Sequence, residues 1–489
     1  MQPVTSQRLK DVLPRKRDLY YGGAWQVPKG GYTETFNPGT GESLGECADA
    51  NAEDVGAAVQ AAQKAFESWR HSKPLDRAAM LGRAADILRQ NAEELALIDA
   101  QNCGNPVTEM SSDALHAAAQ IDFFAGLVTE IKGETIPMGS GVINMTVREP
   151  IGVCARITAY NHPLMFSAGK FAPPIAAGNT VIIKPPPQAP LSAIRMMELL
   201  DGVFPPGVLN VITGGTPAGE ALVLHPKVPM LTLIGSVPTG RAIARQAAGQ
   251  LKRLIFELGG KNALIVFPDA DIDQAIANAV KGMNFTWCGQ SCGSTSRLFI
   301  HESVYELVLA GVIEGVKYYK PGIPTDPATT MGSIVSQEQL DKILGYIEIA
   351  KNEGARLVFG GNCPADKELQ NGFYIEPTIF ADVKSDMRIA QEEVFGPVLS
   401  VLKWSDEDQL FAEVNSVEYG LTGAIFTRDL ATAHRAASRL EAGFVWVNRA
   451  GPHFMGAPYG GYKQSGIGRE ESIDELLSFT QIKNINIAF

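Results

Sequence analysis

The sequence lacks several features that would assign it to a specialised class of protein. Its 489 residues include only 6 cysteines, too few for a disulfide scaffold, so free thiols in a reducing compartment such as the cytoplasm are expected. Its formal net charge is -11, whereas a nucleic-acid-binding protein normally has a basic face. No apolar run is long enough to predict a membrane span, and residues 1–20 lack the apolar segment of a secretory signal.

The histidines are scattered as well. None of the 7 is paired with another at the spacing of zinc ligands, so no metal site is expected. The remaining composition, with 45% apolar and 19% charged residues, is that of an ordinary globular protein. A chain of this length exceeds what one hydrophobic core usually covers, which predicts two or three domains.

Residues 1–130 are predicted to be mainly helical. Asn51 followed by Asp54 indicates a capped helix start, and residues 55–69 carry apolar side chains at spacings of three and four. The apolar residues between Met80 and Ile98 continue the same periodicity and predict one further helix.

From residue 150, short apolar runs alternate with helical segments. The expected strands are 152–159, 180–184, 208–212, 230–234 and 254–257, with helices at 189–200, 218–224 and 239–248. This alternation predicts βαβ units and a parallel sheet, and a second α/β series runs from 262 to 456. Residues 142–149 and 478–487 alternate like edge strands, which predicts pairing with each other or with another subunit.

Two cysteines, Cys288 and Cys292, lie four residues apart in the segment WCGQSCGS. A zinc site would need two more ligands, and the spacing is not the C-x-x-C of redox proteins. Both cysteines could simply be buried, although the small polar neighbours favour a thiol exposed at a turn. A nucleophile is the fourth interpretation, and it requires an oxyanion donor and a base that activates water.

Two other segments could supply these partners. Asn161 follows an expected strand, where its amide could donate to an oxyanion or could instead cap the next helix. Glu257 ends an apolar strand, where burial would raise its pKa and suit it as a general base, unless it pairs with Lys261. The local pattern leaves both alternatives open.

Together these motifs resemble those of the aldehyde dehydrogenase superfamily over nearly the whole chain. The glutamate motif is similar to Glu257-Leu258-Gly259-Gly260-Lys261, the cysteine motif to Gly289-Gln290-Ser291-Cys292, and the oxyanion motif to Asn161-His162-Pro163-Leu164. Tyr160 stands where the family mostly has Trp. Further matching segments are Ile183-Lys184-Pro185, Gly235-Ser236, Glu392-Glu393-Val394-Phe395-Gly396-Pro397 and Pro458-Tyr459-Gly460-Gly461-Tyr462-Lys463-Gln464-Ser465-Gly466.

The resemblance implies an α/β, aldehyde dehydrogenase-like fold with three parts. Residues 1–129 and 151–258 would form a Rossmann-type NAD(P)-binding domain, and 259–456 an α/β catalytic domain. Residues 130–150 and 457–489 would form a small β extension for oligomerisation, giving a homodimer or homotetramer.

It also implies NAD(P)-dependent oxidation of an aldehyde to a carboxylic acid through a cysteine thiohemiacetal and a thioester. Cys292 would be the nucleophile, Asn161 and the Cys292 N–H would hold the oxyanion, and Glu257 would activate the hydrolytic water. Lys170 and Glu470 match positions proposed to pass protons outward, with ordinary surface charges as the alternative.

The implied cofactor contacts surround a turn without the usual G-x-G-x-x-G motif. A helix start after Ser236 would offer backbone amides to the pyrophosphate. Many NAD-preferring members carry Glu three residues after the lysine, whereas Pro187 stands here, so NAD or NADP is expected and NADP acceptance is predicted. The implied cofactor residues are Lys184, Gly235, Ser236, Glu393, Phe395, Ile157, Tyr160, Pro187, Gly219 and Leu258.

The expected substrate pocket is aromatic and apolar, which predicts a hydrophobic or aromatic aldehyde. Arg449 leaves an acid semialdehyde as the alternative. Glu257 favours hydrolysis over transfer to CoA, because CoA-acylating members tend to lack this glutamate. A catalytically silent structural protein would have lost the motifs that this chain retains. Cys288 would pack behind the site or form a protective disulfide with Cys292. The expected pocket residues are His162, Met165, Phe166, Ser291, His453 and Tyr459.

Overall fold

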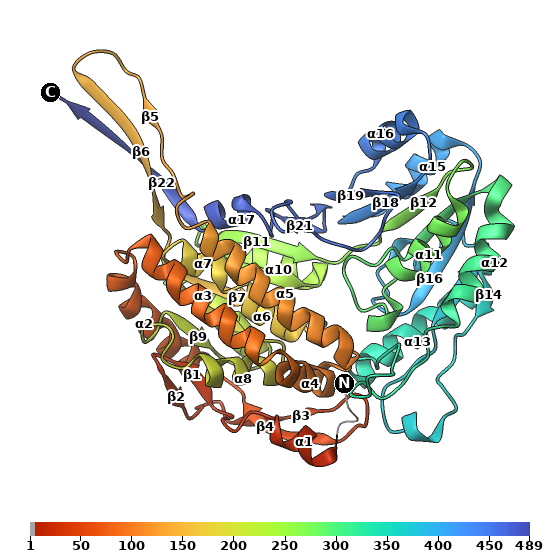
Figure 1. Ribbon diagram of the computed structural model, residues 1–489, viewed down its shortest axis with the longest axis horizontal. Coiled ribbons are helices and arrows are strands. Elements are labelled where there is room, and N and C mark those ends of the chain that lie inside the picture. Colours follow the sequence, from red (N-terminus) through yellow and green to blue (C-terminus); the bar gives the residue numbers. More distant parts are fainter. Residues whose placement is uncertain (1–4) are drawn as a thin grey trace.

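The computed structural model of the protein describes residues 5–489 and contains two large sheets, helices packed over both, and a projecting three-stranded arm (Figure 1). The first sheet has the order β2-β1-β9-β8-β7-β10-β11-β21, and its five central strands are parallel. Their order reverses between β7 and β10, the topological switch point at which open α/β sheets bind ligands. The strands are β1 (Leu19–Tyr21), β2 (Ala24–Gln26), β7 (Val153–Ile157), β8 (Thr180–Lys184), β9 (Leu209–Val211), β10 (Met230–Gly235), β11 (Arg253–Leu258) and β21 (Gly466–Ile467).

Helices cover both faces of this sheet. Val181 and Ile183 of β8 pack into one hydrophobic core and Ile182 into the other, so the strand is buried on both sides. This explains the uninterrupted apolar runs of the central strands. The helices are α1 (Ser6–Asp11), α2 (Ala52–Trp69), α3 (Pro74–Gln90), α4 (Ala92–Cys103), α5 (Val107–Gly126), α6 (Pro163–Gly169), α7 (Ala172–Ala176), α8 (Leu191–Leu200), α9 (Thr216–Leu224) and α10 (Val237–Ala248).

The second sheet has the order β14-β15-β16-β13-β12-β18-β19 and is parallel except for the edge strand β14. Its strands are β12 (Ala263–Val266), β13 (Arg297–His301), β14 (Arg356–Phe359), β15 (Thr378–Ala381), β16 (Val398–Trp404), β18 (Thr422–Phe426) and β19 (Phe444–Val447). The accompanying helices are α11 (Ile272–Gly282), η1 (Phe285–Trp287), η2 (Glu302–Val304), α12 (Tyr305–Val316), α13 (Gln337–Asn352), η3 (Lys367–Leu369), α14 (Arg388–Gln391), α15 (Glu407–Val414) and α16 (Leu430–Arg439).

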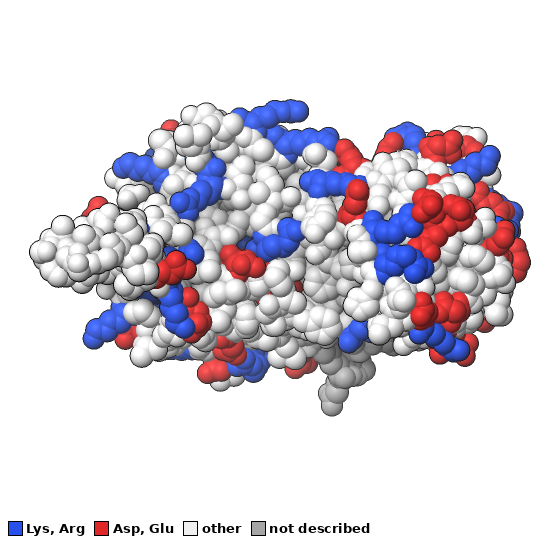
Figure 2. All heavy atoms as spheres, turned by 90° about the horizontal axis from the view of Figure 1, so that it is seen from above, with Lys and Arg blue, Asp and Glu red and all other residues white. Residues whose placement is uncertain are grey.

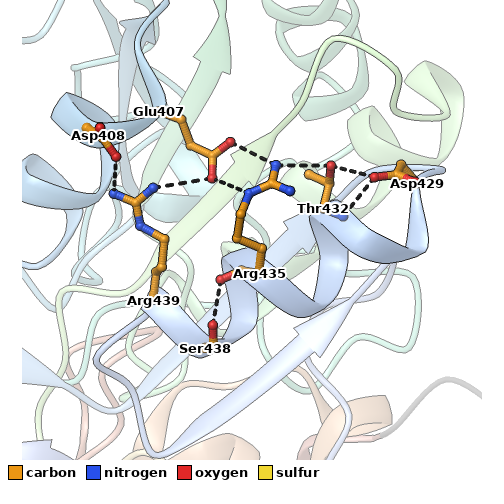
Figure 3. A network of polar contacts seen from close by, with 7 residues as sticks. All are labelled: Glu407, Asp408, Asp429, Thr432, Arg435, Ser438 and Arg439. Carbon is orange, nitrogen blue, oxygen red and sulfur yellow. Dashed lines mark hydrogen bonds and ion pairs between the residues drawn. The ribbon is translucent and has the colours of Figure 1, made fainter.

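Charged side chains gather at the end of the molecule that the second sheet forms, on the right in Figure 2. There a polar network joins α15 to α16: Glu407 accepts hydrogen bonds from Arg435 at 2.9 Å and from Arg439 at 3.4 Å (Figure 3). Asp429 caps α16 by accepting from the Thr432 N–H at 2.8 Å. Exposed ion pairs contribute about 0–1 kcal/mol each, so this network adds little to the stability of the helix pair on the surface.

The arm consists of β5 (Thr135–Ile136), β6 (Val142–Pro150) and β22 (Thr480–Ala488), in the order β22-β6-β5. β22 pairs antiparallel with β6 along its whole length, from Thr480 opposite Pro150 to Ala488 opposite Val142. The helix α17 (Ile473–Ser478) leads into it. The smaller sheets pair β3 (Tyr32–Phe36) with β4 (Ser43–Ala48), and β17 (Tyr419–Gly420) with β20 (Tyr462–Lys463).

The expected strands of both α/β series and the pairing of the two alternating segments are confirmed. Residues 1–130 are mainly helical, as expected, although residues 19–48 include four short strands. One expectation is wrong. The apolar period from Met80 to Ile98 belongs to two helices, since α3 ends at Asn91, whose side chain donates to the Ile87 carbonyl at 2.7 Å. No helix among residues 5–489 is long and apolar enough to cross a membrane.

Candidate active site

One cleft collects side chains from both sheets. Asn161, which follows β7, and Glu257, at the end of β11, line it together with Cys292 from a loop of the second sheet. Glu393 and Phe395 line the same cleft. The structure therefore brings the expected nucleophile, amide and carboxylate into one site beside the switch point.

The loop that carries Cys292 is held by neighbouring amides. The Asn262 side chain donates to the Cys292 carbonyl at 2.7 Å and to the Ser294 carbonyl at 2.9 Å. Gly260 is required beside it, because an added Cβ would lie 2.9 Å from the Cys292 carbonyl oxygen. The Cys292 side chain is half-buried, and burial and the neighbouring Glu257 raise its pKa well above the ordinary value.

Cys288 occupies a different environment. It is 1% exposed within the core of the second sheet, and its Sγ–H donates to the Gly332 carbonyl at 3.1 Å. Its φ of 55° places it in the left-handed region at a sharp turn, followed by Gly289 at 64°. This burial favours a packing role for Cys288, while its more exposed neighbour Cys292 faces the cleft.

Asn161 presents a free amide. The helix α6 begins at Pro163 with His162 as its cap residue, so the alternative that Asn161 caps this helix is wrong. The Asn161 carbonyl accepts from the Asn105 side chain at 2.7 Å, which fixes its backbone. Its own side chain forms no hydrogen bond to any residue of the described chain, and it can donate to an oxygen in the cleft.

Glu257 is buried in the way expected for a general base. It is 4% exposed, and within residues 5–489 its Oε1 has no hydrogen-bond partner. Burial raises its pKa to about 8. The alternative of an ion pair with Lys261 is wrong, since the buried Lys261 Nζ also has no partner in that part of the chain.

Lys170 and Glu470 are buried neighbours of Glu257, so the surface-charge alternative is wrong for both. Lys170 Nζ lies 3.0 Å from Glu470 Oε2, and Arg156 donates to Glu470 at 3.2 Å and to Glu475 at 3.1 Å. Burial opposes charge on Lys170, but Glu470 and Glu475 outweigh it and raise the Lys170 pKa above its usual value. Through their charges, Glu470 raises the pKa of Glu257 and Lys170 lowers it.

The residues expected to hold the pyrophosphate form a turn from strand to helix. Gly235 ends β10, and Ser236 caps α10 by accepting from the Thr239 N–H at 3.3 Å. The first backbone amides of this helix are suited to an anion. Ile157 and Leu258 are the last residues of the flanking strands β7 and β11.

The residues expected around the two riboses form two separate groups, one near Lys184 and one near Glu393. Lys184 ends β8, and an added Cβ on Gly219 would lie 3.8 Å from its side chain. Pro187 is exposed beyond the same strand. At the other end, Glu393 Oε1 accepts from the Gly260 N–H at 2.9 Å. The Tyr160 ring meets the Phe395 ring edge-on, with centroids 5.9 Å apart. The residues present thus offer a cation, a carboxylate and backbone amides that fit a dinucleotide.

The expected substrate residues form two groups, of which the one with Tyr459 contacts the nucleophile. Tyr459 is buried with its hydroxyl 3.9 Å from Cys292 Sγ, and the His453 ring stacks on it at 4.0 Å. His162 is buried against the rings of Trp287 and Phe166 at 4.6 and 5.4 Å. Met165 and Ser291 are half-buried, and Met165 packs against the core of the first sheet. Arg449 is exposed, with its guanidinium 5.4 Å from the centre of the Phe454 ring.

Two carboxylates of this region did not follow from the sequence. Asp113 accepts a bond from His162 Nδ1 at 2.6 Å, and Glu471 Oε1 lies 3.4 Å from His453 Nδ1. Burial opposes a charged imidazole, but Asp113 outweighs it and raises the pKa of His162. No periodicity in the sequence links either histidine to its carboxylate. Glu471 could have been found only because it is adjacent to the expected residue Glu470.

Comparison with known proteins agrees with this geometry. Residues 25–485 match the aldehyde dehydrogenase family. Aldehyde dehydrogenase tropH of Talaromyces stipitatus is 54% identical over 487 residues, which cover 98% of this chain and 95% of that protein. An NAD+ complex of aldehyde dehydrogenase from Bacillus cereus is 36% identical with a TM-score of 0.95, covering 99% of both chains. An indole-3-acetaldehyde dehydrogenase mutant of P. syringae, in complex with NAD+ and IAA, is 36% identical with a TM-score of 0.96, covering 99% of this chain and 98% of that one. The chain belongs to the aldehyde dehydrogenase family.

Proposed function

We propose that Cys292, Asn161 and Glu257 carry out the reaction of this NAD(P)-dependent aldehyde dehydrogenase, the oxidation of an aldehyde to a carboxylic acid. The supporting observation is that one cleft at the switch point holds all three side chains. The thiol is half-buried, the amide has a free donor, and Oε1 of the buried carboxylate has no partner in the described chain. Each group has the property that its step requires.

The first step is attack of the Cys292 thiolate on the aldehyde carbon. A C–S bond forms, and the carbonyl electron pair moves to the oxygen, where the Asn161 amide and the Cys292 N–H donate to it. One such donor is worth about 3 kcal/mol of transition-state stabilisation. The chemistry that NAD(P) supplies when bound is acceptance of the hydride, which leaves the acyl group on sulfur as a thioester.

Hydrolysis of the thioester completes the reaction. Glu257 removes a proton from water, the acyl C–O bond forms, the C–S bond breaks, and the thiolate is released. A pKa of about 8 lets this carboxyl exchange protons near neutral pH. Lys170 and Glu470, paired at 3.0 Å behind it, would pass the proton outward.

The cofactor contacts follow from the same cleft. Gly235 and Ser236 would bind the pyrophosphate at the start of α10, and Lys184 the adenine ribose. Glu393 and Phe395 would hold the nicotinamide ribose. Ile157, Tyr160, Pro187, Gly219 and Leu258 would complete the binding surface.

A hydrophobic or aromatic aldehyde is the proposed substrate. Tyr459 lies against the nucleophile with His453 stacked on it, and the segment after Asn161 would add the rings of His162 and Phe166. Met165 and Ser291 would complete this pocket. One structural relative is an indole-3-acetaldehyde dehydrogenase, an enzyme named for an aromatic aldehyde. Arg449 is exposed, which disfavours the acid semialdehyde alternative. Relative rates on benzaldehyde, hexanal, succinic semialdehyde and betaine aldehyde test this; a strong preference for betaine aldehyde would contradict it.

The cysteine mechanism is tested by trapping the thiol. Iodoacetamide should abolish turnover after labelling Cys292, and Cys292→Ser should lose nearly all activity, because a hydroxyl is a far weaker nucleophile at neutral pH. Cys363, which is exposed, provides the control through Cys363→Ser. Retained turnover in Cys292→Ser would refute the mechanism. Free acid formed without CoA would separate this reaction from CoA acylation.

The projecting arm is proposed to mediate a homodimer or homotetramer. Its surface is nearly free of charged side chains at the left of Figure 2 and exposes Ile143, Ile482 and Phe489. The free outer edge of β22 could pair with another subunit.

Residues 1–129 with 151–258 would bind NAD(P), and residues 259–456 would carry the nucleophile. Six free cysteines fit a reducing cytoplasm. Sedimentation of the chain with and without residues 480–489 tests whether the arm mediates the assembly of subunits.

A further inference from the structure

The Tyr459 hydroxyl has one hydrogen-bond partner among the described residues, the sulfur of Cys292. The distance of 3.9 Å lies within the reach of a hydrogen bond to sulfur, and the phenol is 3% exposed. Gly293 borders this approach, because an added Cβ there would lie 3.5 Å from the hydroxyl, in ordinary van der Waals contact. The Tyr459 backbone exchanges two hydrogen bonds with Glu470, at 3.0 and 2.7 Å, so the ring is held from a fixed strand segment.

We propose that Tyr459 is a further catalytic residue, whose hydroxyl donates a hydrogen bond to the Cys292 sulfur whenever that sulfur is a thiolate. This inference rests on the proposed function of Cys292 as nucleophile. The thiolate exists twice in each turnover, before attack on the aldehyde and when the acid leaves. In both states the donor would stabilise negative charge on sulfur without forming or breaking a covalent bond.

A thiolate at this position needs such a donor. Burial and the nearby carboxyl of Glu257 both disfavour a charged sulfur, whereas the Tyr459 hydroxyl is the contact that favours it. Burial together with Cys292, Glu257 and Glu471 raises the pKa of Tyr459 well above its usual value. The phenol therefore keeps its proton and remains a donor over the working pH range.

His453 and Glu471 position the tyrosine ring. His453 stacks on it with centroids 4.0 Å apart and an interplanar angle of 29°. Phe444 packs on the ring from a second direction at 5.6 Å. Glu471 is 8% exposed, and its φ of 64° turns the backbone so that its side chain lies beside His453. Burial works against a charged Glu471, but His453 and Lys170 outweigh it and lower its pKa. A charged carboxylate thus anchors the imidazole over the phenol.

A simpler role is open to Tyr459, namely that it only lines the substrate pocket. The two roles differ in the free enzyme. A lining residue affects KM for the aldehyde and leaves the cysteine unchanged, whereas a donor to sulfur changes the acidity of Cys292 when no substrate is present.

The test is the pH dependence of iodoacetamide labelling of Cys292 in Tyr459→Phe, measured on the full chain without aldehyde or cofactor. Loss of one hydroxyl should move the labelling midpoint upward by about one pH unit, a tenfold smaller thiolate fraction below the midpoint. kcat/KM should fall about tenfold with KM for the aldehyde little changed. His453→Ala should move the midpoint in the same direction by less, because the phenol remains but loses its stacking partner.

Tyr462→Phe is the matched control. Tyr462 lies in the same segment, is 49% exposed, and contacts the Arg469 guanidinium instead of the cleft, so its labelling midpoint should equal that of the unmodified enzyme. An unchanged midpoint in Tyr459→Phe, or a change in KM alone, would overturn the inference while leaving Cys292 as nucleophile. Turnover that survives complete labelling of Cys292 would instead refute the proposed function itself.

Discussion

The two large sheets meet the cleft with opposite ends of their strands. In the first sheet, Asn161 and Glu257 lie at the carboxyl ends of β7 and β11. In the second, Cys292 precedes β13 and Glu393 precedes β16, so the loops at the amino ends of those strands face the cleft. The cleft is complete only where these two edges meet.

The two edges suit different tasks. The carboxyl ends of the first sheet lead to the start of α10, which suits a dinucleotide, and to the Asn161 side chain, which suits an oxyanion. The loops of the second sheet hold two non-glycine residues, Cys288 and Phe395, at positive φ, an uncommon conformation that clusters at functional sites. Under the proposed function, the first sheet would bind and polarise the reactants while the second would supply the reactive sulfur.

Glu257→Gln should give the largest effect from the first sheet. Without the base, hydrolysis slows and kcat should fall by about 10²- to 10⁴-fold, while one equivalent of NAD(P)H per site still appears in a burst. In the unmodified enzyme, kcat should rise with pH and level off above about 8, because only the carboxylate form accepts the proton and its pKa is about 8. Stopped-flow absorbance measures both. A variant with unchanged kcat, or with no burst, would contradict this division of roles.

Asn161→Ala should have the next largest effect. Loss of one oxyanion donor should lower kcat by about 10²- to 10³-fold with little change in KM, because the donor acts on charge that develops in the transition state. Steady-state kinetics on an aromatic aldehyde measure it. Asn352→Ala, at the exposed end of α13, is the control and should be unchanged. If Asn161→Ala acted only on KM, the amide would bind the aldehyde without polarising it.

The sequence predicted the first sheet better than the N-terminal strands for a physical reason. Central strands such as β8 are buried on both faces and read as apolar runs, whereas β1 and β2 are three residues long and carry little pattern. The break between α3 and α4 was missed because the apolar period continues across Asn91.

Prediction of the candidate site was similarly uneven. Asn161 and Glu257 could be placed from their positions at strand ends, but the choice of Cys292 over Cys288 required the family motif. The partners Asp113 and Glu471 could not be predicted, since they lie 49 and 18 residues from the histidines they contact. Long-range polar pairs leave no periodic signal in a single sequence.

The choice between NAD and NADP tests a position of the first sheet just beyond β8. Pro187 follows Lys184 by three residues and offers neither charge nor acceptor, so the enzyme should accept NADP. Pro187→Glu should lower kcat/KM for NADP by about tenfold relative to NAD, since a carboxylate beside the ribose repels a 2′-phosphate. Pro187 is exposed, so the fold should tolerate the change. A hundredfold or greater preference for NAD in the unmodified enzyme would refute the expectation.

Asp113→Asn should produce the smallest effect, because Asp113 acts on the cleft only through His162. That histidine caps α6 directly after Asn161, and its ring is held by Asp113 at 2.6 Å and by Trp287. Asp113, Glu109 and Asp99 all favour the charged imidazole against burial, so removing the closest carboxylate should lower the His162 pKa, and the ring should lose its proton at a lower pH. A loosened ring lets the neighbouring amide shift, and kcat should fall about threefold. NMR titration of the histidine ring protons and steady-state kinetics on the same variant measure the two effects. A lowered pKa with unchanged kcat would show that the first sheet positions Asn161 without help from the helices packed against it.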